Sequence, residues 1–218
     1  MDINVNKDTV VVFDLDDTLY DELDYLRSAY KEIAEILNND DPKSLFSVMF
    51  SMYRSNLNVF KFLEEKYNKD TAFFLNIYRN HYPKIKVRKG VFNLLKSIKE
   101  RGAYIAIITD GRSITQRNKI DALKISPFVD YIVISSEIHS EKPSPKGYNL
   151  VEEKFNLSQY YYIADNVKKD FITPKKRGWK TIGVIDKGKN IHFETYKYIE
   201  NYKTPDSYIY TLKELKII

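Results

Sequence analysis

Residues 9–18 read TVVVFDLDDT, and this stretch decides how the rest of the chain is interpreted. The run Thr9–Phe13 is apolar and β-branched, which is typical of a strand buried on both faces of a parallel sheet. Two carboxylates, Asp14 and Asp16, and the hydroxyl of Thr18 follow it. Because such sheets bind ligands beyond the carboxyl ends of their strands, the residues after each strand are the first candidates for a functional site.

Several later segments resemble this first strand. They lie at residues 104–108, 131–134, 160–164 and 181–185, with a weaker one at 208–210. Between them, apolar spacing and helix-terminating residues predict helices over residues 91–101, 113–123, 145–155 and 168–177. Strands that alternate with helices predict an α/β fold, with helices on both faces of a parallel sheet in a three-layer, Rossmann-like core.

The interval between the first and second strands is much longer than the dozen residues or so that a crossover needs. It carries helical patterns over residues 22–37, 44–54, 59–67 and 71–82. We therefore predict an α/β core domain of residues 1–19 and 87–218 and an inserted helical domain of residues 20–86. A bundle with a purely structural role would show the same pattern, but the position of the insert favours a lid over the carboxyl edge of the sheet.

The composition of the 218 residues is that of a soluble globular protein, with 43% hydrophobic and 30% charged residues. There is no cysteine, which excludes disulfides and thiolate metal sites. The first ten residues lack the apolar region of a signal peptide, and no apolar run approaches the ~20 residues of a membrane helix. The sequence therefore predicts a cytoplasmic protein with no membrane partner.

The formal net charge is +5. In the sequence the excess is scattered, and the tight basic clusters are residues 168–169 and 175–177. Solvated helix faces explain this distribution better than a nucleic-acid footprint, so we predict no nucleic-acid partner.

Polar groups follow the other predicted strands as well. They are Thr109, Asp110 and Gly111 after the second strand, Lys142 beyond the third, and Asp165 and Asp170 after the fourth. If the strands are neighbours, these groups meet at one edge. Several carboxylates packed together are costly unless a cation compensates, and Mg²⁺ with oxygen ligands does so. With no cysteine and three scattered histidines, zinc and copper are disfavoured.

Such a site has the groups needed for phosphoryl transfer. A carboxylate can attack phosphorus, and a second one two residues away can protonate the leaving oxygen and later activate water. Lysine and the metal would balance the charge of the phosphoryl group. The Thr109 hydroxyl and nearby backbone N–H groups would bind its oxygens, since Gly111 lets the backbone approach closely.

The ordered set resembles the four motifs of the haloacid dehalogenase (HAD) superfamily, and the resemblance covers nearly the whole chain. The first motif of the family, DxDx[TV], is matched by residues 14–18, and the second by Thr109. Lys142 matches the third motif, and Asp165 with Asp170 matches the acidic pair of the fourth. The insert between the first and second motifs resembles the helical cap of subclass I.

The resemblance implies a HAD-like phosphoric monoester hydrolase that uses Mg²⁺ and a small phosphorylated metabolite. Asp14 would be the nucleophile, Asp16 the general acid/base and Lys142 the charge-balancing lysine. The implied metal ligands are Asp14, Asp165 and the backbone carbonyl of Asp16, the implied substrate-binding residues are Thr109, Asp110 and Gly111, and the supporting residues are Asp170 and Thr18.

Other functions stay open on the sequence alone. A phosphomutase would use the same nucleophile, and a non-catalytic protein could retain the fold to bind a phosphorylated metabolite. Haloacid dehalogenase chemistry is disfavoured by Asp16, because the dehalogenases lack an acid there. A phosphoacceptor signalling domain is disfavoured because its phosphorylated aspartate follows the third strand. The sequence decides neither the substrate nor the oligomeric state.

Overall fold

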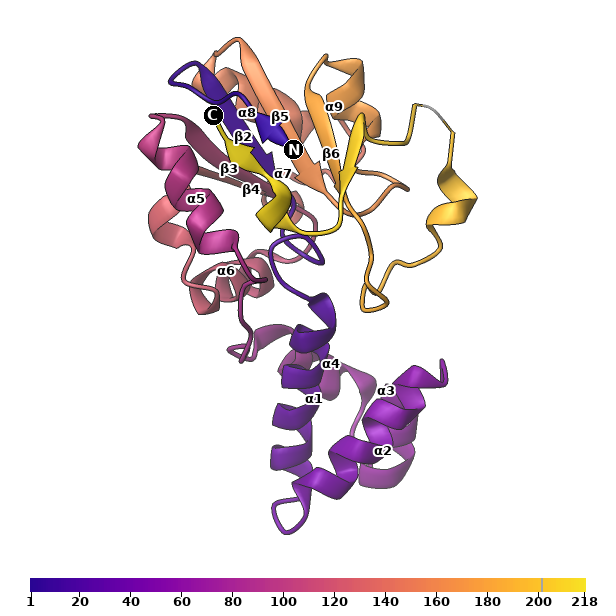
Figure 1. Cartoon of the computed structure of the whole chain (residues 1–218). Helices are drawn as coiled ribbons and strands as arrows, with labels where there is room; N and C mark the ends of the chain where they lie inside the picture. The colour runs from indigo at the N-terminus through magenta and orange to yellow at the C-terminus, as the bar shows by residue number, and fades with distance from the viewer. Residues whose placement is uncertain (201) are drawn as a thin grey trace.

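The computed structural model describes residues 1–200 and 202–218. Its centre is a parallel sheet of six strands in the order β4-β3-β2-β5-β6-β7 (Figure 1). The strands are β2 (Thr9–Phe13), β3 (Tyr104–Thr109), β4 (Tyr131–Ile134), β5 (Gln159–Ala164), β6 (Lys180–Val184) and β7 (Ser207–Ile209). A separate two-stranded parallel sheet pairs β1 (Asp2–Ile3) with β8 (Lys216–Ile217).

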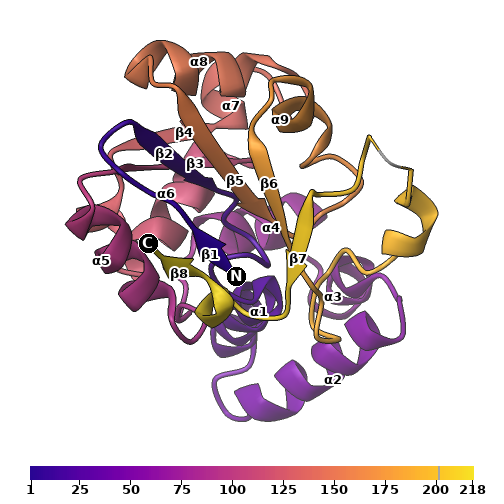
Figure 2. The ribbon, with the colours of Figure 1, turned by 45° about the horizontal axis from the view of Figure 1, so that its top comes forward.

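Both faces of the large sheet are covered. Because side chains alternate along a strand, Val11 and Phe13 of β2 face one apolar layer, and Val10 and Val12 face the other. The first layer packs under α5 (Val91–Glu100) and α6 (Ser113–Ala122), and the second under α7 (Ser135–Ile138), α8 (Lys146–Phe155) and α9 (Ile172–Lys176) (Figure 2). The predicted three-layer α/β fold is confirmed.

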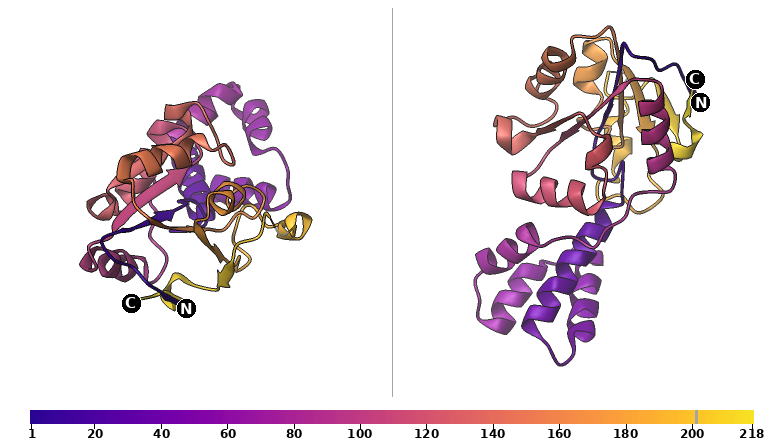
Figure 3. Two further views of the ribbon diagram at one scale, coloured as in Figure 1. Left: turned by 90° about the horizontal axis from the view of Figure 1, so that it is seen from above. Right: turned by 90° about the vertical axis from the view of Figure 1, so that its left-hand side faces the viewer.

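The insert after β2 is a group of four helices with an apolar core of its own. They are α1 (Glu22–Leu37), α2 (Pro42–Arg54), α3 (Val59–Tyr67) and α4 (Thr71–Asn80). Figure 3 shows them below the carboxyl edge of the sheet, joined to it by two linkers. Each of the last three helices begins at an aspartate or asparagine whose side chain accepts a hydrogen bond from the first turn, as helix-capping residues do.

One predicted helix is shorter than expected. Residues 168–177 were predicted to be helical, but α9 begins at Ile172. Asp170 is responsible for the difference, since its carboxylate accepts a hydrogen bond from Asn166 N at 3.1 Å and its own N–H donates to Asn166 O. These bonds hold residues 166–170 in a tight turn. The remaining described elements are short 3₁₀ helices, at Ser126–Phe128, Thr195–Tyr198 and Leu212–Glu214. Among the helices of the described residues, none combines the length and the apolarity that a membrane crossing requires.

Candidate active site

The carboxyl ends of two neighbouring strands bring three carboxylates together. One oxygen from each of Asp14, Asp165 and Asp170 lies within 4.8 Å of the others. Asp14 directly follows β2, and Asp165 directly follows β5, its neighbour in the sheet. The Asp14 N–H donates to Ile163 O at 2.9 Å, which continues the ladder between the two strands and fixes the start of the loop.

A buried lysine occupies the same place. Lys142 Nζ lies 2.7 Å from Asp14 Oδ1 and 2.7 Å from Asp170 Oδ1, and the residue is 7% exposed. Burial opposes the charge of Lys142, but the two carboxylates outweigh it and raise the pKa of the ammonium well above its usual value. The cluster therefore combines three carboxylates with one fixed positive charge.

One lysine does not neutralise this cluster. Burial raises the pKa of Asp14 to about 7, and Asp170 and Asp16 add to the rise although Lys142 opposes it. Burial, with Asp14 and Asp170 nearby, raises the pKa of Asp165 well above its usual value. Because oxygen ligands gathered around uncompensated negative charge are what a hard divalent cation prefers, the residues present fit such an ion.

Asp16 is held by a different set of side chains. Lys119 Nζ lies 2.6 Å from Asp16 Oδ1, Gln116 Nε2 donates to Asp16 Oδ2 at 2.9 Å, and the Tyr20 hydroxyl also donates to Asp16 Oδ1. Burial alone would raise the pKa of Asp16. Lys119 and the three hydrogen bonds outweigh burial and hold that pKa below its ordinary value, so this carboxylate is ionised.

Gln116 also connects Asp16 to the end of β3. Its Nε2 lies 2.5 Å from Thr109 Oγ1, and Thr109 is 1% exposed. Gly111 has a φ of 142°, and a Cβ there would come within 3.1 Å of the Gln116 side chain. A side chain at position 111 would therefore press on the residue that bridges Thr109 and Asp16.

The other two predicted groups of this loop are also in place, with partners of their own. The Gly111 N–H donates to Ser135 Oγ at 2.9 Å. Asp110 Oδ1 accepts from Lys142 N at 3.1 Å, and Asp110 Oδ2 lies 2.5 Å from Lys169 Nζ. The Asp110 carboxylate thus fixes the backbone of Lys142.

Asp165 is oriented by two neutral donors. Thr18 Oγ1 donates to Asp165 Oδ1 at 3.3 Å. Asn190 Nδ2 donates to Asp165 Oδ2 at 2.8 Å, and Asn190 Oδ1 accepts from Arg88. Asn190 lies in the loop after β6, and a single asparagine in a loop gives no signal that sequence reasoning could use.

Sequence reasoning also missed Gln116 and Lys119. Both are at least 96% buried, one turn apart on α6. The helical spacing of Gln116 and Lys119 with the apolar Ile120 could have identified them, because it places all three on one buried face. Buried polar side chains need polar partners.

Comparison with known proteins agrees with this arrangement. The model of the family described as haloacid dehalogenase-like hydrolase matches residues 11–184. A glyceraldehyde 3-phosphate phosphatase of Methanocaldococcus jannaschii is 28% identical over 94% of each chain. A HAD phosphatase from Thermococcus onnurineus has a similar fold, with a TM-score of 0.59, 18% identity and coverage of 94% of this chain and 95% of the other.

A solved L-2-haloacid dehalogenase from Xanthobacter autotrophicus is similar as well, with a TM-score of 0.61, 15% identity and coverage of 96% of each chain. The shared fold therefore includes proteins named for two different reactions, and fold alone does not choose between them. The match to the family model extends from the strand before Asp14 to the end of β6. The chain belongs to the haloacid dehalogenase-like hydrolases.

Proposed function

We propose that this hydrolase is a magnesium-dependent phosphatase that acts on a small phosphomonoester through an aspartyl-phosphate on Asp14. The observation that supports this most strongly is the contact of buried Asp14 with Lys142, inside a cluster of two further carboxylates. A carboxylate placed there can attack phosphorus while a cationic neighbour balances the charge. The relative that is 28% identical is named a glyceraldehyde 3-phosphate phosphatase, which supports a small phosphomonoester as the substrate class.

The chain's own residues would hold the metal. In this proposal the ligands are Asp14, Asp165 and the backbone carbonyl of Asp16. When bound, Mg²⁺ supplies positive charge that stabilises the phosphoryl oxygens. Asp170 is within the same cluster, but its 2.7 Å contact with Lys142 makes it the acid that fixes the lysine.

In the first step, an Asp14 oxygen forms a bond to phosphorus and the bond from phosphorus to the leaving oxygen breaks. Asp16 gives its proton to that leaving oxygen. Lys142 stays beside Asp14 throughout. The Thr109 hydroxyl accepts from Gln116, so its own hydrogen can be donated to a phosphoryl oxygen, and the backbone of Asp110 completes the cradle beside Gly111, whose own N–H donates to Ser135.

In the second step, water attacks phosphorus, Asp16 accepts its proton, and the bond from phosphorus to Asp14 breaks. An ionised Asp16 is what this step requires. The contacts of Asp16 with Lys119 and Gln116 therefore correspond to the base form of the residue. To act as the acid in the first step, Asp16 must carry a proton and turn from Lys119 toward the leaving oxygen.

We propose that residues 20–86 act as a cap domain on the core of residues 1–19 and 87–218. The start of α1 lies beside the loop that carries the proposed catalytic acid Asp16, since the Glu22 N–H donates to Asp17 Oδ1 at 2.9 Å. The core helix α6 contacts the insert, because Thr115 Oγ1 donates to Arg79 O at 2.8 Å. A cap in this place would enclose a small substrate and exclude water during turnover.

Asp16 favours the phosphatase over dehalogenase chemistry. An acid positioned two residues after the nucleophile has a leaving oxygen to protonate in ester hydrolysis. Release of a halide ion needs no proton. The three side chains that hold Asp16 show that this carboxylate is integrated into the site.

The test is phosphate release from a panel of esters that includes glyceraldehyde 3-phosphate, sugar phosphates, nucleoside monophosphates and flavin mononucleotide. We expect release with Mg²⁺, none with EDTA, and none from Asp14→Asn with Mg²⁺ present. Asp8→Asn, which changes an exposed aspartate outside the site, should match the unmodified chain. Release that survives EDTA or Asp14→Asn contradicts the proposal, as does a folded, Mg²⁺-binding protein that releases phosphate from no ester.

A further inference from the structure

A cavity of about 460 Å³ lies where the two ends of the insert meet the carboxyl ends of β6 and β7. We call it the linker cavity. Its walls come from the outgoing linker and the first turn of α1 (Asp21 and Asp24), the returning linker (residues 86–89), the end of β6 with its following loop (Val184, Lys187 and Lys189), and residues 210–213. None of the acids of the proposed metal cluster lines it.

The charge of the linker cavity is strongly positive. Six of its lining residues are cationic and two are anionic. The cationic residues are Lys86, Arg88, Lys89, Lys187, Lys189 and Lys213. The chain as a whole has a net charge of +5, so most of its excess gathers here. The positive excess is scattered along the sequence because these residues come from segments far apart in the chain.

Two of the six cations have protein partners. Arg88 Nε lies 2.7 Å and Lys189 Nζ 3.2 Å from the carboxylate of Asp21. The other four are exposed lysines, and within residues 1–200 and 202–218 no carboxylate forms an ion pair with them. Lysines without partners around one hollow repel one another, and a bound anion would remove that cost.

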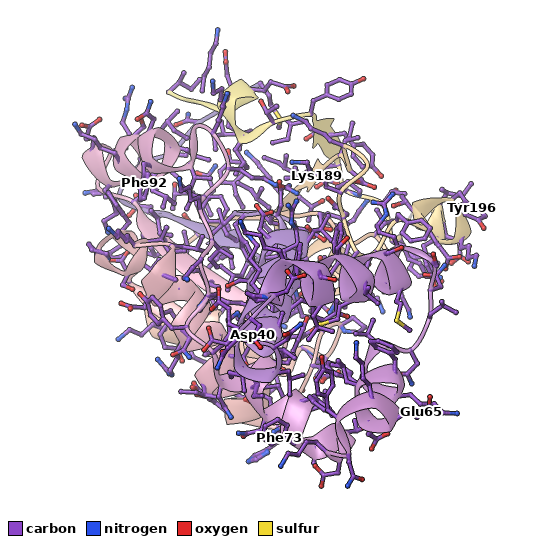
Figure 4. All side chains as sticks on the ribbon, turned by 90° about the horizontal axis from the view of Figure 1, so that it is seen from below. Asp40, Glu65, Phe73, Phe92, Lys189 and Tyr196 are labelled. Carbon is purple, nitrogen blue, oxygen red and sulfur yellow. The ribbon has the colours of Figure 1, made fainter. Side chains whose placement is uncertain are left out.

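The backbone holds two of these segments close together. Gly90 has a φ of 96°, and a Cβ there would lie 2.6 Å from Lys213 Cγ. The returning linker thus packs directly against the segment that carries Lys213, and Lys89 lies next to that contact. Figure 4, which views the molecule from below, labels Lys189 between the helices of the insert and the C-terminal segment.

Apart from Thr211, the uncharged part of the lining is aliphatic or aromatic. Val184 and Leu212 are at most 4% exposed and form part of the wall, whereas the ring of Tyr210 is exposed at 65% and free to stack. Ligand cavities in proteins commonly have volumes of ~300–1,000 Å³, with an apolar lining and a few placed polar groups. A cavity with both an aromatic ring and several lysines matches a ligand with a flat ring and more than one phosphate.

We infer that the linker cavity is a second binding site, distinct from the acid cluster, for a nucleoside di- or triphosphate. The phosphates contact Lys86, Lys89, Lys187 and Lys213, and the base stacks on Tyr210. A cavity of about 460 Å³ suits a small ligand better than a nucleic-acid strand, which needs an extended charged surface. Because the ligand would contact both linkers and the core, it would connect the insert to the sheet.

The test is calorimetric titration of the full chain carrying Asp14→Asn, so that the probes are not hydrolysed, in EDTA at low salt. The probes are ATP, ADP, inorganic triphosphate and adenosine. ATP and ADP should bind with one site, and adenosine should not bind. The fourfold variant Lys86→Gln, Lys89→Gln, Lys187→Gln, Lys213→Gln should weaken ATP binding roughly 100-fold, because each lysine contributes a screened charge contact.

A matched control removes the same net charge elsewhere. Lys7→Gln, Lys43→Gln, Lys61→Gln, Lys176→Gln changes four exposed lysines and should keep the affinity for ATP within about threefold, since none of them lines the cavity. Tyr210→Ala should weaken ATP roughly tenfold and leave inorganic triphosphate unchanged, because the triphosphate has no ring to stack. Equal losses in the two fourfold variants would overturn the site. The site would also be overturned if ATP did not bind saturably, or if a short RNA strand bound in place of ATP. An unchanged ATP affinity in Tyr210→Ala would overturn the nucleotide assignment.

Discussion

Lys119 Nζ lies 2.6 Å from Asp16 Oδ1 and 4.4 Å from the centre of the Tyr25 ring. One buried side chain of α6 therefore contacts both the carboxylate proposed to move the proton and the first helix of the insert. Since a buried ammonium is stable only with partners, these two contacts explain how a lysine that is 4% exposed persists there. Lys119 is a positioning residue, because it acts through Asp16.

Replacement of Lys119 by methionine keeps the length of the side chain and removes its charge. We expect kcat to fall by about 10–100-fold, because Asp16 loses its strongest partner, while KM changes much less. Steady-state kinetics on the best ester separates the two constants. Lys119→Arg restores a positive charge and should recover part of kcat. A rise in KM at constant kcat would show that Lys119 binds substrate instead.

Asp16→Asn should slow esters with poor leaving groups far more than those with good ones. An alkoxide leaving group needs the proton that Asp16 supplies, and loss of a general acid typically costs about 10²–10⁴ in rate. A phenolate with electron-withdrawing groups needs it less. Single-turnover rates on an alkyl and a nitrophenyl phosphate measure the contrast. Equal losses on both would argue against the acid role.

Asp165→Asn should make the metal-free protein more stable and the metal-loaded protein less so. The change removes a carboxylate whose pKa is raised well above its usual value by burial and by the neighbouring Asp14 and Asp170. Mg²⁺ at a hundred times its dissociation constant stabilises a protein by about 2.7 kcal/mol, and most of that gain should disappear in the variant. Thermal unfolding in EDTA and in Mg²⁺ gives both values. An unaltered Mg²⁺ shift would remove Asp165 from the ligand set.

Asn190→Ala tests the donor that sequence reasoning missed. Asn190 Nδ2 orients Asp165 from 2.8 Å, and loss of such a partner typically weakens metal binding about 10–100-fold. The Mg²⁺ concentration for half-maximal activity should therefore rise by at least about tenfold, with kcat at saturating Mg²⁺ nearly restored. Asn149→Ala, on α8 and away from the cluster, is the control. If Asn190→Ala and Asn149→Ala depended on Mg²⁺ identically, Asn190 would have no role in orienting Asp165 for the metal.

Glu152 gives a pH-dependent contribution to stability away from the site. Arg177 and Trp179 Nε1 donate to its carboxylate, and the hydrogen bonds from Arg177 lower the pKa of Glu152. A lowered folded pKa means that the stabilisation is present above the unfolded value of ~4.3 and is lost as the pH falls through the folded pKa. Because the group is partly exposed, we expect Glu152→Gln to cost about 0.5–1 kcal/mol at pH 7.

Urea unfolding followed by the fluorescence of Trp179, the single tryptophan of the sequence, measures this difference. The difference in the free energy of unfolding between Glu152→Gln and the unmodified chain should close as the pH falls through the lowered folded pKa of Glu152. Glu153→Gln changes an exposed neighbour and should show no difference from the unmodified chain at any pH. A difference in the free energy of unfolding that stays constant across the pH range would exclude an ionic contribution of Glu152 to stability.

The elements with strong local patterns were predictable. The strand Thr9–Phe13 and the helix Glu22–Leu37 have the bounds expected from apolar spacing, because one is buried on both faces and the other has a clear buried stripe. The same patterns placed Asp14 and Asp165 at strand ends, and parallel pairing of β2 with β5 then made them neighbours. A local pattern can place these two residues because the carboxyl ends of parallel strands meet at one edge of the sheet.

The remainder depends on contacts between distant segments. Gln116 and Lys119 contact Asp16 because α6 packs beside the loop after β2. The sequence pattern of residues 113–123 predicts a helix but does not determine where that helix packs. Asn190 reaches Asp165 through a loop whose path no periodicity describes. The late start of the helix predicted at 168–177 has a local cause instead, since Asp170 hydrogen bonds to Asn166 and does not begin a helical turn.

The pairing of β1 with β8 has a consequence for synthesis on the ribosome. The insert is one continuous stretch with its own apolar core, so it can fold as soon as α4 has emerged. The core needs strands from both ends of the chain, and β1 must wait for Lys216 and Ile217. Contacts across such separations form slowly. The insert should therefore be native first, with the sheet assembling around it once translation has passed residue 217.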